Sequence, residues 1–582
     1  MAGRESWSSR KAFILAAIGS AIGLGNIWRF PFKCYESGGG AFLVAYLIAM
    51  LTAGVPLLIL ELSLGHRFKL AAPLTFAKVN KKYEWIGWWA VIVGFMITTY
   101  YAVVMAWGLN YSVFSFTQSW GANPGDFFDN YLGLTDGPFN LGKIQLPIFI
   151  ALIVSWILIV AAIWKGAKTV SKVVYLTVII PWILLIVFVV RGVTLPGSMA
   201  GLTYYLKPQF VKLLDPQVWI AAYGQVFFSL SIGFGIMIAY ASFLPKESDI
   251  INSAFIIALS DGATAFIGGF AVFGALGYYA QTTGQAVQDV LKGGPGLAFV
   301  TYPDIINKLP FSKLFGILFF LMLLTLAIDS AFSLVEAVAA SLRDKYGWTH
   351  KKSNIIVALV AFFIGILITT GAGLFWLDIL DKFLEVFGLS IVVLIECFII
   401  GWVFRLDELR DYANKFSEVK IGYIWEVLIK YVIPVVVLAL IVTEAVNLIM
   451  NGYGDYPLRA LILGGWMVVL ILPIVALIIA KTGTATDLDE IYVHEPRTPY
   501  IYESGFRRLN HYFMVLLILG LILVGMIVLS YAYSQIKPYI VYYIGGYVFL
   551  ALIGGAVYFS VLAGKDGNRR EIWAKNALEE DE

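Results

Sequence analysis

Two apolar stretches of the sequence carry oxygen-bearing side chains beside closely spaced glycines. Residues 23–26 read Gly-Leu-Gly-Asn, and residues 231–235 read Ser-Ile-Gly-Phe-Gly. Glycines at this spacing disfavour an unbroken helix, and an interrupted helix frees backbone carbonyls. Carbonyl, hydroxyl and amide oxygens are hard ligands that suit an alkali cation. The alternative is that the glycines only let helices pack closely, but polar side chains in hydrocarbon favour a binding site.

Asp329 is the most informative single residue, because it lies within an apolar run. A carboxylate at bilayer depth costs about 2.5–3.5 kcal/mol on insertion scales unless it is paired. A bound cation is a natural partner for it. The alternative is a structural aspartate that is hydrogen-bonded to neighbouring helices.

The composition shows which solvent surrounds these residues. The 582 residues are 60% hydrophobic and 14% charged, with a mean hydropathy of +0.82, so we expect lipid to be the solvent. The net charge of +3 is uninformative by itself, and we expect no nucleic-acid partner. The two cysteines lie in apolar segments and predict no disulfide framework. The four histidines lie near helix ends or in polar connectors, without a nucleophile motif or metal spacing, which disfavours an enzyme.

The elements that must position the candidate site are membrane helices. Runs of about 20 apolar residues suffice to cross a bilayer, and the sequence contains fourteen of them. They lie at residues 10–36, 41–65, 85–117, 145–164, 172–192, 217–244, 250–281, 312–343, 353–371, 374–404, 423–450, 459–480, 510–533 and 539–563.

Charged residues in the connectors predict the orientation of these runs. Basic residues precede the first run and follow the second and the fourth, whereas the connector 118–144 carries three aspartates against one lysine. Because basic loops stay in the cytoplasm, we expect both termini to be cytoplasmic in a multi-pass plasma-membrane protein.

The first and sixth runs contain the two predicted breaks. Their starts are five spans apart, and an odd number reverses the direction of crossing, so two five-helix units would be inverted copies. We therefore expect the following organisation: a cytoplasmic segment 1–9, a first repeat 10–192, an external connector 193–216, a second repeat 217–406, helices 11 and 12 in 407–480, and two extra helices with a cytoplasmic tail in 481–582.

Several motifs resemble those of the neurotransmitter:sodium symporter family. Residues 19–31 (GSAIGLGNIWRFP) and 36–42 (ESGGGAF) resemble its first-helix signature. The resemblance extends over about residues 1–480 and includes 191–197 (RGVTLPG), 225–230 (QVFFSL), 294–303 (GPGLAFVTYP) and 323–330 (LLTLAIDS). It implies an all-α polytopic protein with the five-plus-five inverted-repeat fold of the bacterial leucine transporter. It also implies sodium-coupled import of a small amino acid, with two sodium sites halfway across the membrane.

The resemblance also implies the sodium ligands. The second sodium site would use carbonyls of Gly19, Ile22 and Leu326 with the side chains of Asp329 and Ser330. The first would use the Ala21 carbonyl, Asn26, Ser229 and one residue of the seventh run. An alignment without a gap places Asp261 where relatives carry a neutral asparagine, whereas a slip of one residue would place Ser260 there.

Asp261 bears on the use of chloride. Animal members of the family bind chloride at positions matched by Tyr46, Gln225, Ser229 and a serine that is Ala265 in this sequence. We expect the fixed carboxylate of Asp261 to replace the anion, so that transport is chloride-independent. Proton antiport through Asp261 is the alternative.

The substrate pocket is implied in the same way. The substrate carboxylate would lie against the amides near Gly23 and Gly25, the Tyr101 hydroxyl and the first sodium, because helix N-terminal amides favour an anion. Family members that carry monoamines place an aspartate at the Gly23 position, so glycine favours an amino acid, unless Asp261 supplies that charge. The expected lining fits a small apolar or aromatic side chain and comprises Ala21, Ile97, Phe228, Ser229, Ser231, Phe234, Ser330, Ala331 and Leu334.

Two ion pairs are candidate gates on either side of this pocket. Arg29 should pair with Asp381 on the outer side, and Arg4 with Asp344 on the inner side; interfacial anchoring is the alternative for all four. Phe228 would cover the pocket, and Glu61 would accept hydrogen bonds from the broken sixth run. A substrate sensor or a channel on the same fold, or a symporter of an osmolyte or amine, remains an alternative function.

Overall fold

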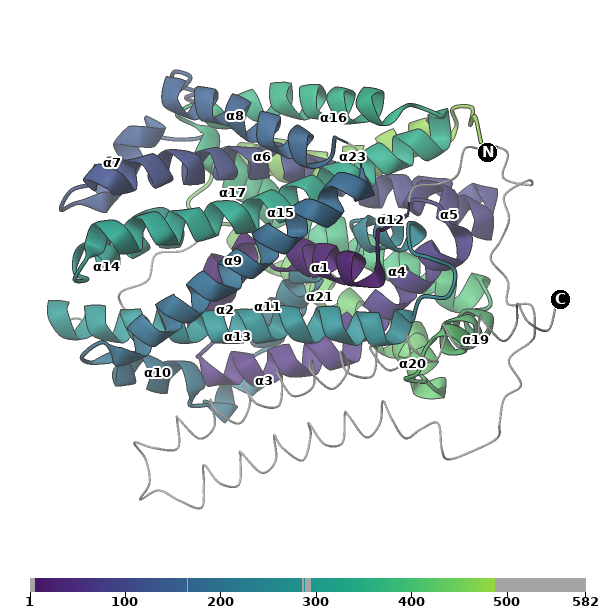
Figure 1. Ribbon diagram of the computed structural model, residues 1–582, viewed down its shortest axis with the longest axis horizontal. Coiled ribbons are helices and arrows are strands. Elements are labelled where there is room, and N and C mark those ends of the chain that lie inside the picture. Colours follow the sequence, from purple (N-terminus) through teal and green to yellow (C-terminus); the bar gives the residue numbers. More distant parts are fainter. Residues whose placement is uncertain (1–5, 165, 285–286, 288–294, 487–582) are drawn as a thin grey trace, which may run out of the picture.

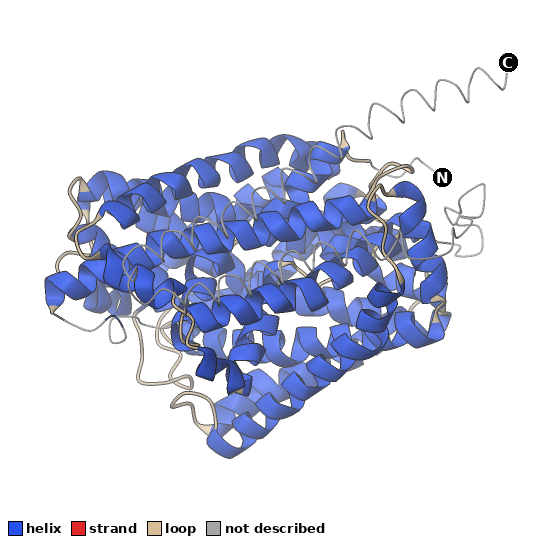
Figure 2. Cartoon of the chain, turned by 90° about the horizontal axis from the view of Figure 1, so that it is seen from below, coloured by secondary structure: helices blue, strands red, loops and turns tan. Residues whose placement is uncertain are grey.

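The computed structural model describes residues 6–164, 166–284, 287 and 295–486. Within these ranges the chain is helical, and its β-structure is limited to two isolated bridges, Gly39 with Pro208 and Ile144 with Thr370. Figure 2 shows the helices running side by side and joined by short loops. The predicted spans 510–533 and 539–563, like Arg4, lie outside the described residues.

In the described part of the chain, nine helical runs are long and apolar enough to cross a membrane. A tenth is the bent pair formed by α1 (Arg10–Ala21) with Gly25–Glu36, which contains η1 (Gly25–Arg29) and α2 (Phe30–Glu36). The nine are Gly40–Phe68 (α3 to α4), Lys81–Thr117 (η3 and α6), Ala167–Thr194 (α9), Ile250–Thr283 (α13), Ser312–Tyr346 (α15), His350–Thr369 (α16 and η7), Gly373–Val403 (α17 to η9), Tyr423–Asn451 (α20 to α21) and Leu458–Ala480 (α22 to α23).

Two predicted spans take a different form. The fourth is α8 (Leu146–Ala162), which at 17 residues is short for a crossing helix. The sixth is divided into α11 (Pro216–Ser229) and α12 (Ile236–Ser242). Every predicted span between residues 10 and 480 therefore coincides with a helix or a pair of helices.

Five short helices lie in segments that hydropathy alone assigned to connectors. Figure 1 shows α7, α10 and α14 toward one end of the bundle and α5 and α19 toward the other. They are too short or too amphipathic to produce a membrane-span signal. Their bounds are α5 (Ala72–Val79), α7 (Pro124–Leu132), α10 (Ser198–Leu206), α14 (Tyr302–Asn307) and α19 (Leu406–Phe416).

The centre of the bundle is formed by α6 and α15, which pack along each other, while α13 packs against α9 and α10. Glycines allow α13 to lie close to α9: a methyl group at Gly274 of α13 would lie 2.6 Å from the Gly192 carbonyl oxygen of α9. Close contact of this kind stabilises helix pairs in lipid, where no hydrophobic driving force acts between them.

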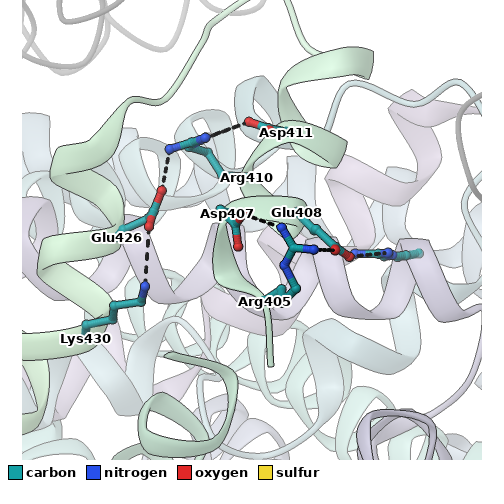
Figure 3. Close-up of polar contacts among 8 residues, drawn as sticks. Arg405, Asp407, Glu408, Arg410, Asp411, Glu426 and Lys430 are labelled. Atoms are coloured by element: carbon teal, nitrogen blue, oxygen red, sulfur yellow. Dashed lines mark hydrogen bonds and ion pairs between the residues drawn. The ribbon is translucent and has the colours of Figure 1, made fainter. Parts of the chain in front are cut away.

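The end that carries α19 is densely charged (Figure 3). Arg405 contacts Asp407 at 3.1 Å and Glu408 at 2.8 Å, and Arg410 pairs with Glu426 of α20. Ion pairs that remain exposed are each worth only about 0–1 kcal/mol. The Arg410–Glu426 pair is buried instead, since these residues are only 9% and 4% exposed.

Candidate functional site

Both predicted breaks are present, at different points of their helices. The chain leaves α1 at Ile22, which has extended torsion angles (φ −81°, ψ 91°), and the two halves of the span are bent by 48°. Between α11 and α12 the backbone adopts positive φ at Ser231 (56°), Gly233 (80°) and Gly235 (72°). Glycine tolerates such angles, but serine does so only at a cost of about 1–2 kcal/mol. The surrounding structure therefore holds Ser231 in place.

Side chains of the same span and of other helices accept hydrogen bonds from the freed amides. Glu61 of α4 is fully buried and accepts from the Gly233 amide at 2.7 Å, which confirms its expected role. The Asn26 side-chain oxygen accepts from the Gly23 amide at 3.1 Å, and the Tyr101 hydroxyl accepts from the Leu24 amide at 3.4 Å. Because a buried amide without a partner is costly, these contacts stabilise the interruptions.

The first carboxylate at the breaks belongs to Asp261 of α13, which is 0% exposed. It accepts hydrogen bonds from the Asn26 amide at 2.7 Å, the Ser229 hydroxyl at 2.7 Å and the Tyr46 hydroxyl at 3.4 Å. These contacts to Asn26 and Ser229 come from Asp261, not from its neighbour Ser260. This geometry agrees with the alignment without a gap, which places Asp261 and not Ser260 at the position of the family's asparagine.

The second carboxylate belongs to Asp329 of α15, which is 1% exposed. The Thr177 hydroxyl of α9 donates to it at 2.5 Å. A methyl group at Gly19 would lie 2.6 Å from its other oxygen, Oδ2, so the carboxylate lies against α1. Beside it, the Ser330 hydroxyl donates to the Ser20 carbonyl at 3.4 Å. Asp329 and Ser330 thus meet the carbonyl end of α1.

Neither carboxylate has a cationic partner in the part of the chain that the structure describes. Among the described residues, no lysine, arginine or histidine forms an ion pair with Asp261 or Asp329. A buried ionised carboxylate without a counter-charge is expensive. Hard oxygen atoms surround both positions, and oxygen atoms of this kind are the ligands that an alkali cation takes.

A cavity of about 30 Å³ lies between the two breaks. It is lined by all but one of the residues expected at the pocket. Ala331 does not line it, because the helical period turns Ser330, Ser333 and Leu334 to the cavity and Ala331 away from it. The full lining is Ser20, Ala21, Gly23, Leu24, Gly25, Asn26, Ile97, Tyr101, Phe228, Ser229, Ser231, Phe234, Ile236, Ser330, Ser333 and Leu334.

Sequence reasoning missed the serine hydroxyls at one side of this cavity. Ser20 lies 3.2 Å from the Ser231 hydroxyl and donates to the Ser333 hydroxyl at 2.8 Å. Ser333 falls three residues after Ser330, on the same helical face, and that spacing was the available signal.

The comparisons with known proteins agree with this arrangement. The family model described as the sodium:neurotransmitter symporter family matches residues 4–124 and 122–485. The chain belongs to this family. Its members couple solute movement to sodium, so the chain is a multi-pass membrane transporter and not an enzyme.

Individual relatives support the assignment. The chain is 42% identical over 487 residues to an uncharacterized sodium-dependent transporter of Methanocaldococcus jannaschii, an alignment that covers 83% of this chain and 98% of that protein. It is 34% identical to the sodium- and chloride-dependent GABA transporter 2 of Rattus norvegicus, covering 74% and 77% respectively. It is 32% identical to the sodium-dependent dopamine transporter of Caenorhabditis elegans, covering 79% and 84%.

On one side of the cavity, Arg29 lies over the ring of the lining residue Phe228. Arg29 pairs with Asp381 at 3.1 Å, as expected, and also with Glu385, which the sequence analysis missed. Its guanidinium carbon lies 4.5 Å from the centroid of the Phe228 ring. Tyr100 donates to Asp381 at 2.7 Å. Arg29 is thus held between two carboxylates and a ring face.

On the other side, the segment before α1 is anchored by Trp7. Its indole donates to the Tyr240 carbonyl of α12 at 2.8 Å, and its amide donates to the Phe243 carbonyl at 3.1 Å. The Asp344 carboxylate accepts from the Ala71 amide at 2.7 Å. Because Arg4 lies outside the described residues, the inner ion pair stays a prediction.

Proposed function

We propose that this chain is a sodium-coupled symporter that imports a small neutral amino acid by alternating access. The observation that carries the proposal is the position of Asp261 and Asp329, which are buried and lack ionic partners among the described residues. Asp261 is hydrogen-bonded to Asn26 and Ser229, which line the cavity between the breaks, and Asp329 directly precedes Ser330, which lines it too. Membership of a sodium symporter family supplies the coupling ion.

The proposal includes two sodium sites, and contacts in the structure support each of them. The first is formed by the Ala21 carbonyl with Asn26, Ser229 and Asp261, whose side chains contact one another. The second is formed by Asp329 and Ser330 with the carbonyls of Gly19, Ile22 and Leu326. It is supported by the contact of Asp329 with Gly19 and of Ser330 with the Ser20 carbonyl.

The substrate carboxylate would lie at Gly23 and Gly25 near the Tyr101 hydroxyl, where a positive helix end and the first sodium attract an anion. The opposite part of the cavity presents Ile97, Phe234 and Leu334 with the serine hydroxyls. This mixture of apolar groups and hydroxyls suits a small neutral side chain.

We further propose the repeat organisation that the sequence predicts. Residues 10–192 and 217–406 would form two inverted five-helix units, joined by the external connector 193–216. Residues 407–480 would add helices 11 and 12, and residues 481–582 two more helices and a tail. The broken helix of each unit contributes to the same cavity, as this organisation requires. Both termini would be cytoplasmic, in the plasma membrane.

Arg29 with Asp381 would open and close the outer path, and Arg4 with Asp344 the inner path. The energy comes from sodium entry, which yields about 2.3 kcal/mol per charge at 100 mV. Two sodium ions would thus supply about 4.6 kcal/mol, enough for a concentration ratio of more than about a thousandfold. Sodium needs only to bind the outward-facing state better than the inward-facing one.

Chloride independence is the remaining part of the proposal. The Asp261 carboxylate is hydrogen-bonded to Tyr46 and Ser229, and it supplies a fixed negative charge beside the first sodium position. Uptake into proteoliposomes should therefore continue when gluconate replaces chloride. Uptake that collapses under this replacement would contradict chloride independence.

Thermal unfolding of the purified full-length chain tests the function. Single amino acids are added with sodium or with potassium, because a ligand that binds the folded state raises the unfolding temperature by mass action. We expect a small neutral amino acid to stabilise the protein only in sodium. Stabilisation by the same amino acid in both salts would count against sodium coupling.

A further inference from the structure

A larger hollow lies on the flank of the bundle, away from the cavity between the two helix breaks. It runs between α8, α9 and α16, beside residues 6–8, and has a volume of about 1620 Å³. Small-molecule pockets usually measure roughly 300–1,000 Å³, so this groove is too large for the proposed substrate. Its walls are mainly apolar and include Ile153, Trp156, Ile157, Leu359 and Phe362.

The groove contains a basic and aromatic region. Lys168 and Lys172, both exposed, line it from the first turns of α9. Lys351, in the first turn of α16, places its ammonium 5.6 Å from the centroid of the Trp164 ring, which also lines the groove. Its described lining contains no aspartate or glutamate. Tryptophan and tyrosine are typical of the membrane–water interface, and the lining contains Trp7, Trp156 and Tyr175 besides Trp164.

We propose that this groove binds an anionic phospholipid. The acyl chains lie along the apolar faces of α8 and α16, and the phosphate lies among the ammonium groups of Lys168, Lys172 and Lys351. Basic pockets between membrane helices select anionic headgroups in this way. A zwitterionic lipid of the same chain length fills the same walls, but its headgroup carries no net charge for the three lysines to attract.

The groove also adjoins elements that position residues around the cavity between the two helix breaks. Trp7, which lines the groove, is hydrogen-bonded to Tyr240 of α12. The helix α9 carries Thr177, the hydrogen-bond donor to Asp329. A lipid in the groove contacts both the segment that leads into α1 and α9, so it stabilises the arrangement in which these elements are packed together.

The test measures lipid binding to the full-length protein in mild detergent. The probes are phosphatidylglycerol and phosphatidylcholine with identical chains, read out by native mass spectrometry and by the shift in unfolding temperature. The triple variant K168Q/K172Q/K351Q removes the charges, and K168R/K172R/K351R keeps them and guards against a folding defect. Ala161→Trp fills the groove, because Ala161 lines it. The matched control K78Q/K81Q/K82Q removes three lysines from α5 and η3, outside the groove.

We expect the wild type, the arginine variant and the control to retain phosphatidylglycerol over phosphatidylcholine. The glutamine variant should lose about tenfold or more in affinity for phosphatidylglycerol and little for phosphatidylcholine, and Ala161→Trp should lose both lipids. Equal binding of the two lipids by the wild type would overturn the proposal, as would an equal loss in the control. A change of oligomeric state in Ala161→Trp without loss of lipid would assign the groove to a second copy of the chain and would also overturn it.

Discussion

Asp261 and Asp329 are both buried but differ in what surrounds their charge. Asp261 accepts hydrogen bonds from Asn26, Ser229 and Tyr46. Asp329 accepts one from Thr177 in the described part of the chain, and its other oxygen lies against Gly19 near the end of α1. A helix C-terminus carries free carbonyls and partial negative charge. Donors therefore surround Asp261, whereas acceptors adjoin Asp329, so we expect Asp329 to depend more strongly on a bound cation.

The largest effect should follow from Asp329→Asn, which removes the charge but keeps the shape. Loss of one partner from a buried charge pair costs about 2–5 kcal/mol, so sodium affinity should fall on the order of 100-fold or more. Sodium-dependent thermal stabilisation measures this fall. Asp411→Asn on α19 is the control and should behave as the wild type. If Asp329→Asn is stabilised by sodium with the same midpoint concentration as the wild type, Asp329 is not part of the sodium site.

Asp261→Asn should have a smaller effect that depends on chloride. We expect about tenfold weaker sodium affinity in gluconate, because the donors remain when the charge is lost. Chloride should restore the affinity, since Tyr46 and Ser229 stay in place and the buried Gln225 amide has no hydrogen-bond partner among the described residues. Sodium titrations in the two anions measure the difference. Asp329→Asn should show no such rescue, and an equal rescue in both variants would invalidate the comparison.

Thr177→Val tests how far Asp329 depends on its hydroxyl donor. A hydrogen bond to a charged group contributes about 1.5–3 kcal/mol, so sodium affinity should fall about tenfold. Thr177→Ser keeps the hydroxyl and should retain most of the affinity. Sodium midpoints that are the same for Thr177→Val and the wild type would show that the donor is dispensable.

Tyr46→Phe removes one of the three donors to Asp261 and should have the smallest effect. At 3.4 Å the contact is long for a bond between oxygen atoms, and two shorter bonds remain. We expect sodium affinity to change about threefold or less. An effect larger than that of Thr177→Val, in the same titration, would reverse the proposed difference between the two carboxylates.

Much of the fold could be predicted because lipid imposes a simple rule. Apolar length gave the positions of the long helices between residues 10 and 480, and the glycine spacing gave the breaks near Gly23 and Gly233. The short connecting helices α7 and α19 were missed, because their stability comes from caps and tertiary packing that hydropathy does not report. Asn123, which caps α7, was a usable local signal.

The candidate site could be predicted where its residues belong to a recognisable motif. It was predicted less well where helix packing determines which residues are in contact. Asn26, Ser229 and Asp261 converge, and Arg29 meets Asp381. Thr177, Ser333 and Glu385 were missed, because their helices carry no signature at those positions and their contacts depend on how helices are rotated against one another. Ala331 was wrongly placed in the cavity lining for the same reason.

Accumulation of the stabilising amino acid by proteoliposomes is the most direct test of the account. An inward sodium gradient should drive the internal concentration above the external one, dissipation of the gradient should abolish accumulation, and Asp329→Asn should not accumulate. A wild-type protein that binds the amino acid without accumulating it, or that only equilibrates it across the membrane, would contradict sodium-coupled symport.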